Sequence, residues 1–168
     1  MIRHFKPSVT VAAVVAKTFD GVEKFLLVEE LTRDGLKLNN PAGHLDEGES
    51  LAAACARETM EETAYGFKPL ALVGVYMSRF QRASVDAAQG HEDITYLRFA
   101  FYGELGEHFA GQPLDEGIVR ALWMTADEIR ESSDRHRSPL LVTCMEDYLA
   151  GKRFPLEMVA TDASVFAL

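Results

Sequence analysis

The N-terminal quarter of the chain alternates short apolar runs with polar turns. Val9–Lys17 and Phe25–Glu29 each have the apolar run of a buried strand, and the intervening Asp20-Gly21 is typical of a hairpin turn. We therefore expect these two segments to pair as strands. Two segments without clear periodicity come next, an irregular stretch at Leu31–Asn40 and a loop at Pro41–Glu49.

A helical pattern begins at residue 51. The run LAAACA at residues 51–56 consists largely of strong helix formers and Ser50 is a good N-cap, so we expect a helix over about Leu51–Thr63. Further along, Thr125 and Glu128 have the spacing of a capping box, which predicts the start of another helix. The other predicted elements are strands at Leu70–Met77, Ile94–Leu105 and Ile118–Met124, a polar loop at Gln81–Gly90, and helices at Ala126–Ser132 and Pro139–Ala150.

Strands that alternate with helices indicate the α/β class, with a mixed sheet between helices. The 168 residues are enough for one domain with its own core, so we expect a single domain over residues 1–168. No apolar run is long enough to cross a membrane, and we interpret the short run Val9–Ala16 as a strand rather than an export signal.

Composition narrows the class of partner. The net charge of −9 argues against binding to the phosphate backbone of a nucleic acid. It leaves room for a small phosphorylated molecule, because bound cations invert the local field. Cys55 and Cys144 form no C-x-x-C pair and are expected to be reduced, buried thiols, which suits a cytoplasmic protein. The oligomeric state, monomer or homodimer, stays open.

Acidic residues gather on the predicted helix that follows Ser50. Glu58, Glu61 and Glu62 stand at positions i, i+3 and i+4, which places three carboxylates on one helix face. Like charges at this spacing weaken a helix by roughly 0.2–0.5 kcal/mol per pair. A hard divalent cation with oxygen ligands, Mg²⁺ or Mn²⁺, would relieve that repulsion and keep positions open for water and substrate phosphate.

The stretch from Gly43 to Tyr65 resembles the Nudix box, the signature of the Nudix hydrolase family, which is written G-x5-E-x7-R-E-U-x-E-E-x-G-U with U a bulky apolar residue. All of its charged positions match. Thr59 stands where an apolar residue is usual, and Ala64 stands where the family has glycine. Alanine resists the left-handed conformation that ends a helix, so a later stop, at Gly66, is the alternative to an end at Thr63. The resemblance implies an α/β/α sandwich.

Short blocks outside the box, among them Lys6–Ala12 and Gly151–Met158, resemble the NudJ-type phosphatases, a bacterial group of this family. That resemblance implies hydrolysis of phosphoanhydride bonds in nucleoside tri- and diphosphates, or in thiamine-type pyrophosphates, by water that a metal ion activates. Two alternatives stay open. One is a hydrolase of nucleoside diphosphate derivatives such as ADP-ribose, and the other is a non-catalytic nucleotide-binding module.

The family resemblance also assigns roles. Glu58 and Glu62 are the expected metal ligands, Glu61 is a ligand or the general base, and the Gly43 carbonyl is a further ligand. Glu49 is a supporting or ligating carboxylate, and Arg57 is expected to hold these carboxylates by paired hydrogen bonds. The position of the base stays open.

A further carboxylate often comes from a downstream loop in this family, and Glu116 is our candidate, ahead of Asp115, Glu92 and Asp93. Substrate contacts are expected from Arg79 and Tyr96. Weaker candidates, each with a core or solvent position as its ordinary interpretation, are His44, Tyr76, Phe80, Arg82 and Arg98.

Overall fold

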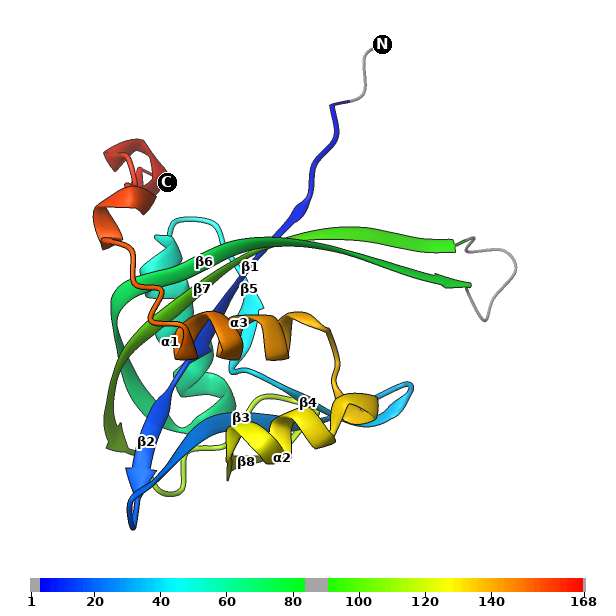
Figure 1. The fold of residues 1–168 in the computed structure, drawn as a ribbon. Coiled ribbons are helices and arrows are strands. Elements are labelled where there is room, and N and C mark those ends of the chain that lie inside the picture. Colours follow the sequence, from blue (N-terminus) through cyan, green and yellow to red (C-terminus); the bar gives the residue numbers. More distant parts are fainter. Residues whose placement is uncertain (1–3, 84–90, 168) are drawn as a thin grey trace.

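The computed structural model describes residues 4–83 and 91–167, apart from the side chains of residues 82, 83, 91 and 92. Its strands form two four-stranded sheets (Figure 1). The first has the order β5-β1-β7-β6 and consists of β5 (Ala42–His44), β1 (Ser8–Val14), β7 (His91–His108) and β6 (Tyr65–Ala83). In the second, β3 (Val22–Thr32) pairs with β2 (Ala16–Phe19), β4 (Gly35–Asn39) and β8 (Ile118–Met124).

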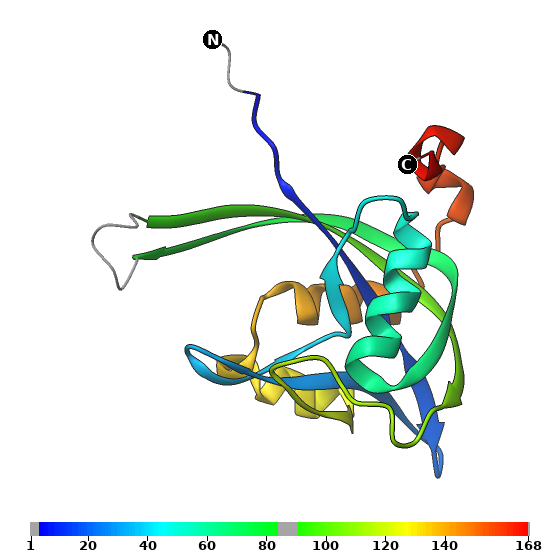
Figure 2. The same cartoon turned by 180° about the vertical axis from the view of Figure 1, so that it is seen from behind.

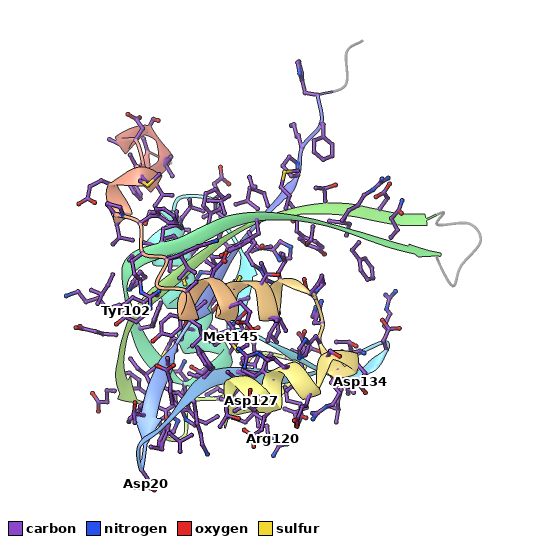
Figure 3. All side chains as sticks on the ribbon, viewed as in Figure 1. Asp20, Tyr102, Arg120, Asp127, Asp134 and Met145 are labelled. Carbon is purple, nitrogen blue, oxygen red and sulfur yellow. The ribbon has the colours of Figure 1, made fainter. Side chains whose placement is uncertain are left out.

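The first sheet is mixed, as expected. Strands β1 and β7 run parallel, whereas β5 and β6 pair antiparallel with β1 and β7, respectively. The strand predicted over Val9–Lys17 is divided between the two sheets: it breaks at Val15, whose carbonyl accepts a hydrogen bond from the backbone N–H of Leu26 at 2.9 Å. The continuation, β2, forms the expected hairpin with β3, and Asp20 lies at its tip (Figure 3).

Helices cover both faces of the first sheet. Helix α1 (Leu51–Thr63) lies on one face and α3 (Leu140–Leu149) on the other, as the two opposite views show (Figures 1 and 2). The short helix α2 (Ala126–Glu131) lies beside β3, and three 3-10 turns follow at Ser133–Arg135, Leu156–Val159 and Ala163–Phe166. Within the described residues, none of the helices is both long and apolar enough to cross a membrane.

Strand β1 contributes to the core on both faces of the first sheet, because successive side chains of a strand point to opposite faces. Val11 and Ala13 belong to the apolar cluster that includes Cys55 of α1. Ala12 and Val14 belong to the cluster that includes Cys144 of α3. Both cysteines are free and buried, so the expectation of buried thiols holds.

Helix starts were the most accurate expectations. Helix α1 has the predicted bounds, and the Ser50 side chain accepts a hydrogen bond from the Ala53 N–H. The capping box at Thr125 is present. Helix α3 begins one residue after the predicted Pro139, which is its N-cap, and the Ser138 hydroxyl accepts a hydrogen bond from the Leu140 N–H at 3.2 Å.

Three predictions about strands were wrong. The loop predicted at Pro41–Glu49 contains β5. Leu31–Asn40 is not irregular, because β3 continues to Thr32 and β4 returns beside it. Strand β6 begins at Tyr65 rather than Leu70: Pro69 interrupts the ladder only locally, at a register shift, since proline lacks the N–H that regular pairing needs. The loop predicted at Gln81–Gly90 begins inside β6, and its residues 84–90 lie outside the described part of the chain.

Candidate active site

Helix α1 brings Glu58 directly against strand β5. In the β1–β5 ladder Val11 pairs with Gly43, and the Glu58 carboxyl group packs onto the α-carbon of Gly43. A Cβ added at Gly43 would come within 2.0 Å of the Glu58 carboxyl carbon. Position 43 must therefore be glycine if Glu58 is to keep this place.

A second buried carboxylate, Glu62, is tied to the same strand. Its Oε2 accepts a hydrogen bond from the Ala42 N–H at 2.8 Å. Burial raises the pKa of Glu62 to about 8, against the opposing effect of the Ala42 hydrogen bond. Burial also raises the pKa of Glu58, although the neighbouring Arg57 opposes this shift. Two desolvated carboxyl groups this close to each other favour a bound cation, which would stabilise their charged forms.

Arg57 connects the acidic residues of this region. Its Nε and Nη2 donate a bidentate pair of hydrogen bonds to Glu49, at 3.0 and 2.7 Å. Its Nη1 donates to Glu58 at 2.9 Å and to Glu61 at 2.8 Å, and Nη2 also reaches the His44 carbonyl at 3.0 Å. The hydrogen bond from Arg57 lowers the pKa of Glu49. The paired hydrogen bonds expected of Arg57 are thus present.

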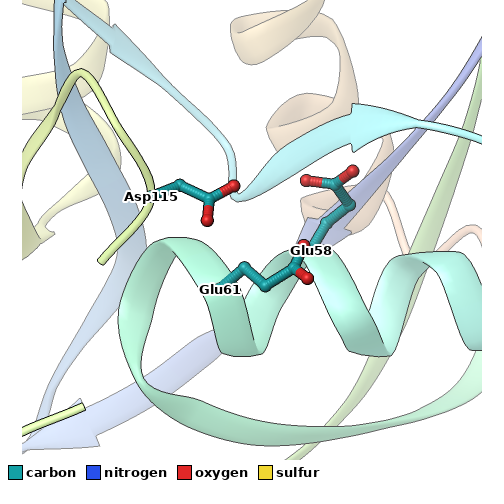
Figure 4. Close-up of side chains that lie close together, drawn as sticks. All are labelled: Glu58, Glu61 and Asp115. Carbon is teal, nitrogen blue, oxygen red and sulfur yellow. The ribbon is translucent and has the colours of Figure 1, made fainter. Parts of the chain in front are cut away.

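Three carboxylates from two segments meet beside α1 (Figure 4). One oxygen each from Glu58, Glu61 and Asp115 lies within 4.8 Å of the others, a spacing that could hold a metal ion. Asp115 comes from the connection between β7 and β8, and its backbone N–H donates to the Glu61 carbonyl at 3.0 Å. This hydrogen bond uses a carbonyl that the end of a helix leaves unpaired and fixes the connection onto α1.

The cluster differs in two respects from the expected ligand set. Glu62 turns toward Ala42 and is not one of the three clustered residues. The downstream carboxylate in the cluster is Asp115, whereas our candidate Glu116 is exposed and stands outside it. Neighbouring acidic residues in a loop point in different directions, and nothing in the sequence indicates which of the two faces the helix.

The departures from the Nudix box have local explanations. Ala64 takes the left-handed conformation itself, with φ at 57°, and its N–H donates to the Met60 carbonyl, so α1 ends at the box position and not near Gly66. The predicted end at Thr63 is thus confirmed, and the alternative of a later stop was wrong. Thr59 is buried, and its hydroxyl donates to the Cys55 carbonyl at 2.7 Å, which satisfies the polar atom inside the helix.

Glu58, Glu62 and Asp115 line a cleft of about 850 Å³. Its lining includes Gly43, Glu58, Glu62 and Asp115, strand residues of β4, β6 and β7, and the start of α3. The cleft is thus large enough for a small molecule whose charged end meets the carboxylates while the rest contacts the strands.

The candidate substrate residues differ in their surroundings. His44, Arg79, Phe80, Tyr96 and Arg98 all line the cleft. Arg79 is exposed and paired with Asp93, with 2.7 Å between Nε and Oδ1, so Asp93 lies with this arginine and not in the carboxylate cluster. Arg98, expected to face solvent, is only 8% exposed, so that interpretation was wrong.

Three candidates remain, of which the structure describes the side chain of one. Tyr76 is held by α3, because its hydroxyl donates to Asp147 at 2.9 Å, and it is not among the residues lining the cleft. The side chains of Arg82 and Glu92 lie outside the described part of the structure.

Comparison with known proteins agrees with this geometry. The family model of the NUDIX domain matches residues 8–143. This chain belongs to the Nudix family. As a Nudix hydrolase it acts on phosphoanhydride bonds, and the expected Nudix fold, with a mixed sheet and helices in the α/β class, is confirmed.

Relatives of this Nudix hydrolase include bacterial phosphatases. Phosphatase NudJ of Escherichia coli K12 is 38% identical over 155 residues, which cover 92% of each chain. A solved NUDIX hydrolase from Nitrosomonas europaea is 47% identical, with a TM-score of 0.79 over 94% of this chain and 98% of that one. The NUDIX domain of Shewanella oneidensis NrtR, solved with ADP ribose, is 20% identical with a TM-score of 0.58 over 87% of this chain and 90% of that one, which shows the fold alone.

Proposed function

We propose that this Nudix hydrolase uses Mg²⁺, or Mn²⁺ in its place, to hydrolyse nucleoside tri- and diphosphates or thiamine-type pyrophosphates. The observation that carries the proposal is the carboxylate cluster of Glu58, Glu61 and Asp115 beside a cleft of about 850 Å³. The similarity to phosphatase NudJ over 92% of the chain supports the substrate class.

The residues present fit a hard divalent cation. The cluster offers carboxylate oxygens alone, with no thiolate or imidazole among its three members, and such ligands suit Mg²⁺ or Mn²⁺. Glu58, Glu61 and Asp115 would hold the ion, with Glu62 and the Gly43 carbonyl as further candidates. A bound cation would neutralise charge on the substrate phosphates and make water a better nucleophile.

Hydrogen bonds from Arg57 would hold the proposed metal ligands in place for this reaction. Arg57 fixes Glu58 and Glu61 through hydrogen bonds from a single nitrogen, Nη1, and is itself held by Glu49. Preorganised charges of this kind lower the reorganisation needed in the transition state. The side chain of Glu61 is 37% exposed, so it is open enough to accept a proton from water as well as to bind a metal ion.

Product identity tests the proposal. Purified protein with Mg²⁺ or Mn²⁺ would be incubated with GTP, GDP, thiamine pyrophosphate, its pyrimidine precursor pyrophosphate and ADP-ribose, and all products would be quantified. Orthophosphate from nucleotides or thiamine compounds supports the proposal. Nucleoside monophosphate released from ADP-ribose supports the alternative hydrolase, and tight binding without turnover supports a non-catalytic module.

The variant Glu61→Gln tests the metal site itself. We expect it to fold normally and to lose turnover by orders of magnitude, because the amide cannot carry the negative charge that the site needs. Glu131→Gln, at the exposed end of α2, is the matched control and should keep full activity. Unchanged turnover in Glu61→Gln would remove Glu61 from the proposed site.

A further inference from the structure

The hairpin of β6 and β7 extends past the neighbouring strand of its sheet (Figures 1 and 2). The ladder between β1 and β7 starts at the pair Ser8–Tyr96, so within the described residues the hairpin has only two strands from the pair Arg79–Thr95 outward. We call this part, residues 79–83 and 91–95, the arm. A two-stranded ribbon is marginally stable in water. Apolar side chains on the arm therefore gain free energy from any group that covers them.

One face of the hairpin has an apolar panel, which consists of Phe80, Ile94 and Tyr96. Phe80 pairs with Ile94 across the ladder, and residues paired in this way lie on the same face of a sheet. Tyr96 is two residues along β7 from Ile94, so it lies on this face too. All three residues line the cleft. The panel thus faces the same cleft as Glu58 and Asp115.

Packing in the core does not account for the panel. None of its three residues belongs to either apolar cluster in the described part of the chain. Phe80 is 38% exposed. A cross-strand apolar pair does stabilise a hairpin, but it does not require the ring to stay open to a cleft. Apolar and aromatic groups left exposed together in a cleft are typical of a surface that binds a ligand.

The panel begins close to the carboxylates. The ring centroid of Tyr96 lies 6.3 Å from that of His44, and His44 follows the glycine against which the Glu58 carboxyl group packs. Phe80 and Ile94 lie one step further out along the hairpin, about 7 Å beyond Tyr96, which is the rise of two residues in a strand. A substrate with its diphosphate at Glu58 can therefore extend its organic group along the panel.

We propose that Phe80 and Ile94 bind a planar ring of the substrate, so that the enzyme prefers diphosphates with an aromatic ring over diphosphates without one. Aromatic rings stack or meet edge to face, which adds to the burial of apolar area. Stacking tolerates any base, because every base has a π-face. The panel therefore favours a ring without distinguishing one nucleobase from another or from the rings of thiamine. This inference rests on the proposed function and assigns the part of the site that holds the ring.

Steady-state kinetics in Mg²⁺ compare GDP and thiamine pyrophosphate with methyl diphosphate, which has no ring. We expect the wild-type KM for the two ring-bearing substrates to lie about tenfold or more below that for methyl diphosphate. Phe80→Ala should raise the KM for GDP and thiamine pyrophosphate about tenfold and leave kcat nearly unchanged, because the ring contact is the same in the ground state and the transition state. The KM for methyl diphosphate should not change.

Met77→Ala is the matched control on the same strand. Met77 is 64% exposed and lies three residues from Phe80, so it points to the opposite face of β6, and it is not among the residues lining the cleft. This variant should keep the wild-type KM for all three substrates. Phe80→Leu keeps an apolar side chain without a π-face and should recover only part of the lost affinity. Full recovery would overturn stacking on Phe80.

Thermal unfolding separates ring binding from a structural role. Because Phe80 stands outside the core clusters, Phe80→Ala should keep a Tm close to that of the wild type. A lower Tm with equal rises in KM for GDP and methyl diphosphate would make Phe80 structural and overturn the proposal. A wild-type protein with the same KM for GDP and methyl diphosphate would also overturn it.

Guanosine tests ring binding apart from hydrolysis, because it carries no phosphate and needs no metal ion. Titrated into ¹⁵N-labelled protein with EDTA present, it should shift the amide NMR signals of Phe80 and Ile94 more than those of α2. Phe80→Ala should abolish the shift at Ile94. If these shifts occur while no substrate is hydrolysed, the proposed function fails and this inference stands. Absence of shifts on the arm would overturn the inference, whether or not GDP is hydrolysed.

Discussion

At the scale of single residues, the position of the Glu58 carboxyl group depends on the absence of a side chain at Gly43. Replacing Gly43 with alanine would drive a methyl group to 2.0 Å from the Glu58 carboxyl carbon, so the carboxylate must leave its position. We expect Gly43→Ala to fold and to lose most turnover and metal affinity. Isothermal titration with Mn²⁺ and a turnover assay would measure both effects.

Gly66→Ala is the matched control for that substitution. A Cβ at Gly66 meets no atom nearer than 3.7 Å, an ordinary contact distance. This variant should therefore bind Mn²⁺ and turn over substrate as the wild type does. Normal metal binding by Gly43→Ala would contradict the contact on which the argument depends.

Ala64 carries conformational strain, because an L-residue in the left-handed region costs about 1–2 kcal/mol. Its φ of 57° ends α1. Ala64→Gly should relieve most of this cost and raise the free energy of unfolding by about 1 kcal/mol, as measured by urea denaturation. The opposite control is Ala53→Gly at an exposed position inside α1, which should lower stability by about the same amount.

Some site residues could be found in the sequence and others could not. Glu49, Arg57 and Glu58 stand at fixed spacings on and before one helix, so local geometry brings them together. Asp115 and Arg98 come from distant segments whose position depends on sheet register. Arg98 also follows the alternating pattern of a strand, and alternation alone does not distinguish a solvent-facing arginine from one in a cleft.

At the scale of elements, the connection between β7 and β8 contributes Asp115 to the carboxylate cluster. It is fixed to the end of α1 by the Asp115–Glu61 backbone hydrogen bond and by a bond of 2.8 Å from the Phe109 N–H to the Ala64 carbonyl. The helix end and the connection therefore hold their positions together. The carboxylate of Asp115 reaches the cluster because its backbone is fixed in this way.

Asp115→Asn should weaken metal binding about tenfold or more, with little effect on folding, because it removes one anionic oxygen ligand and keeps the backbone hydrogen bond. Titration with Mn²⁺ monitored by electron paramagnetic resonance measures the affinity. Glu116→Gln changes the adjacent exposed carboxylate by the same chemistry and should leave the affinity unchanged. The reverse result would restore Glu116 as the ligand.

Elements with strong local signals were predicted well. Helix α1 and the capped start of α2 have sequence signals that depend on a few neighbouring residues. Strand β4 had only a short signal: Leu36 and Leu38 alternate with Lys37 and Asn39 over five residues, and of the two leucines only Leu38 is buried. Pairing with β3 determines that it is a strand, and pairing is a property of the tertiary structure.

At the scale of the whole molecule, a bound metal ion should stabilise the fold. A ligand present at 100 times its Kd stabilises the native state by about 2.7 kcal/mol. Mg²⁺ or Mn²⁺ should therefore raise the Tm, and EDTA should reverse the rise, in a scanning fluorimetry experiment. KCl at equal ionic strength is the control, and a rise of the same size in Glu58→Gln would show that the ion binds elsewhere.

The α/β class was predictable from the order of elements, but the division into two sheets was not. Residues 9–17 form one apolar run in the sequence, and the break at Val15 arises from contacts with Leu26. The parallel pair of β1 and β7 joins segments such as Ser8 and Tyr96, far apart in the chain. No local pattern specifies such a partner.

The central place of β1 has a consequence for the order of folding. The hairpin of β6 and β7 is local in sequence and can close early, whereas the parallel pairing of β1 with β7 must first close a long loop, at a cost in chain entropy. Strand β1 is also the link between β5 and β7. Gly43 and Arg98 therefore face a common cleft only after this late step, and we expect substrate-binding competence to be among the last properties that the refolding chain acquires.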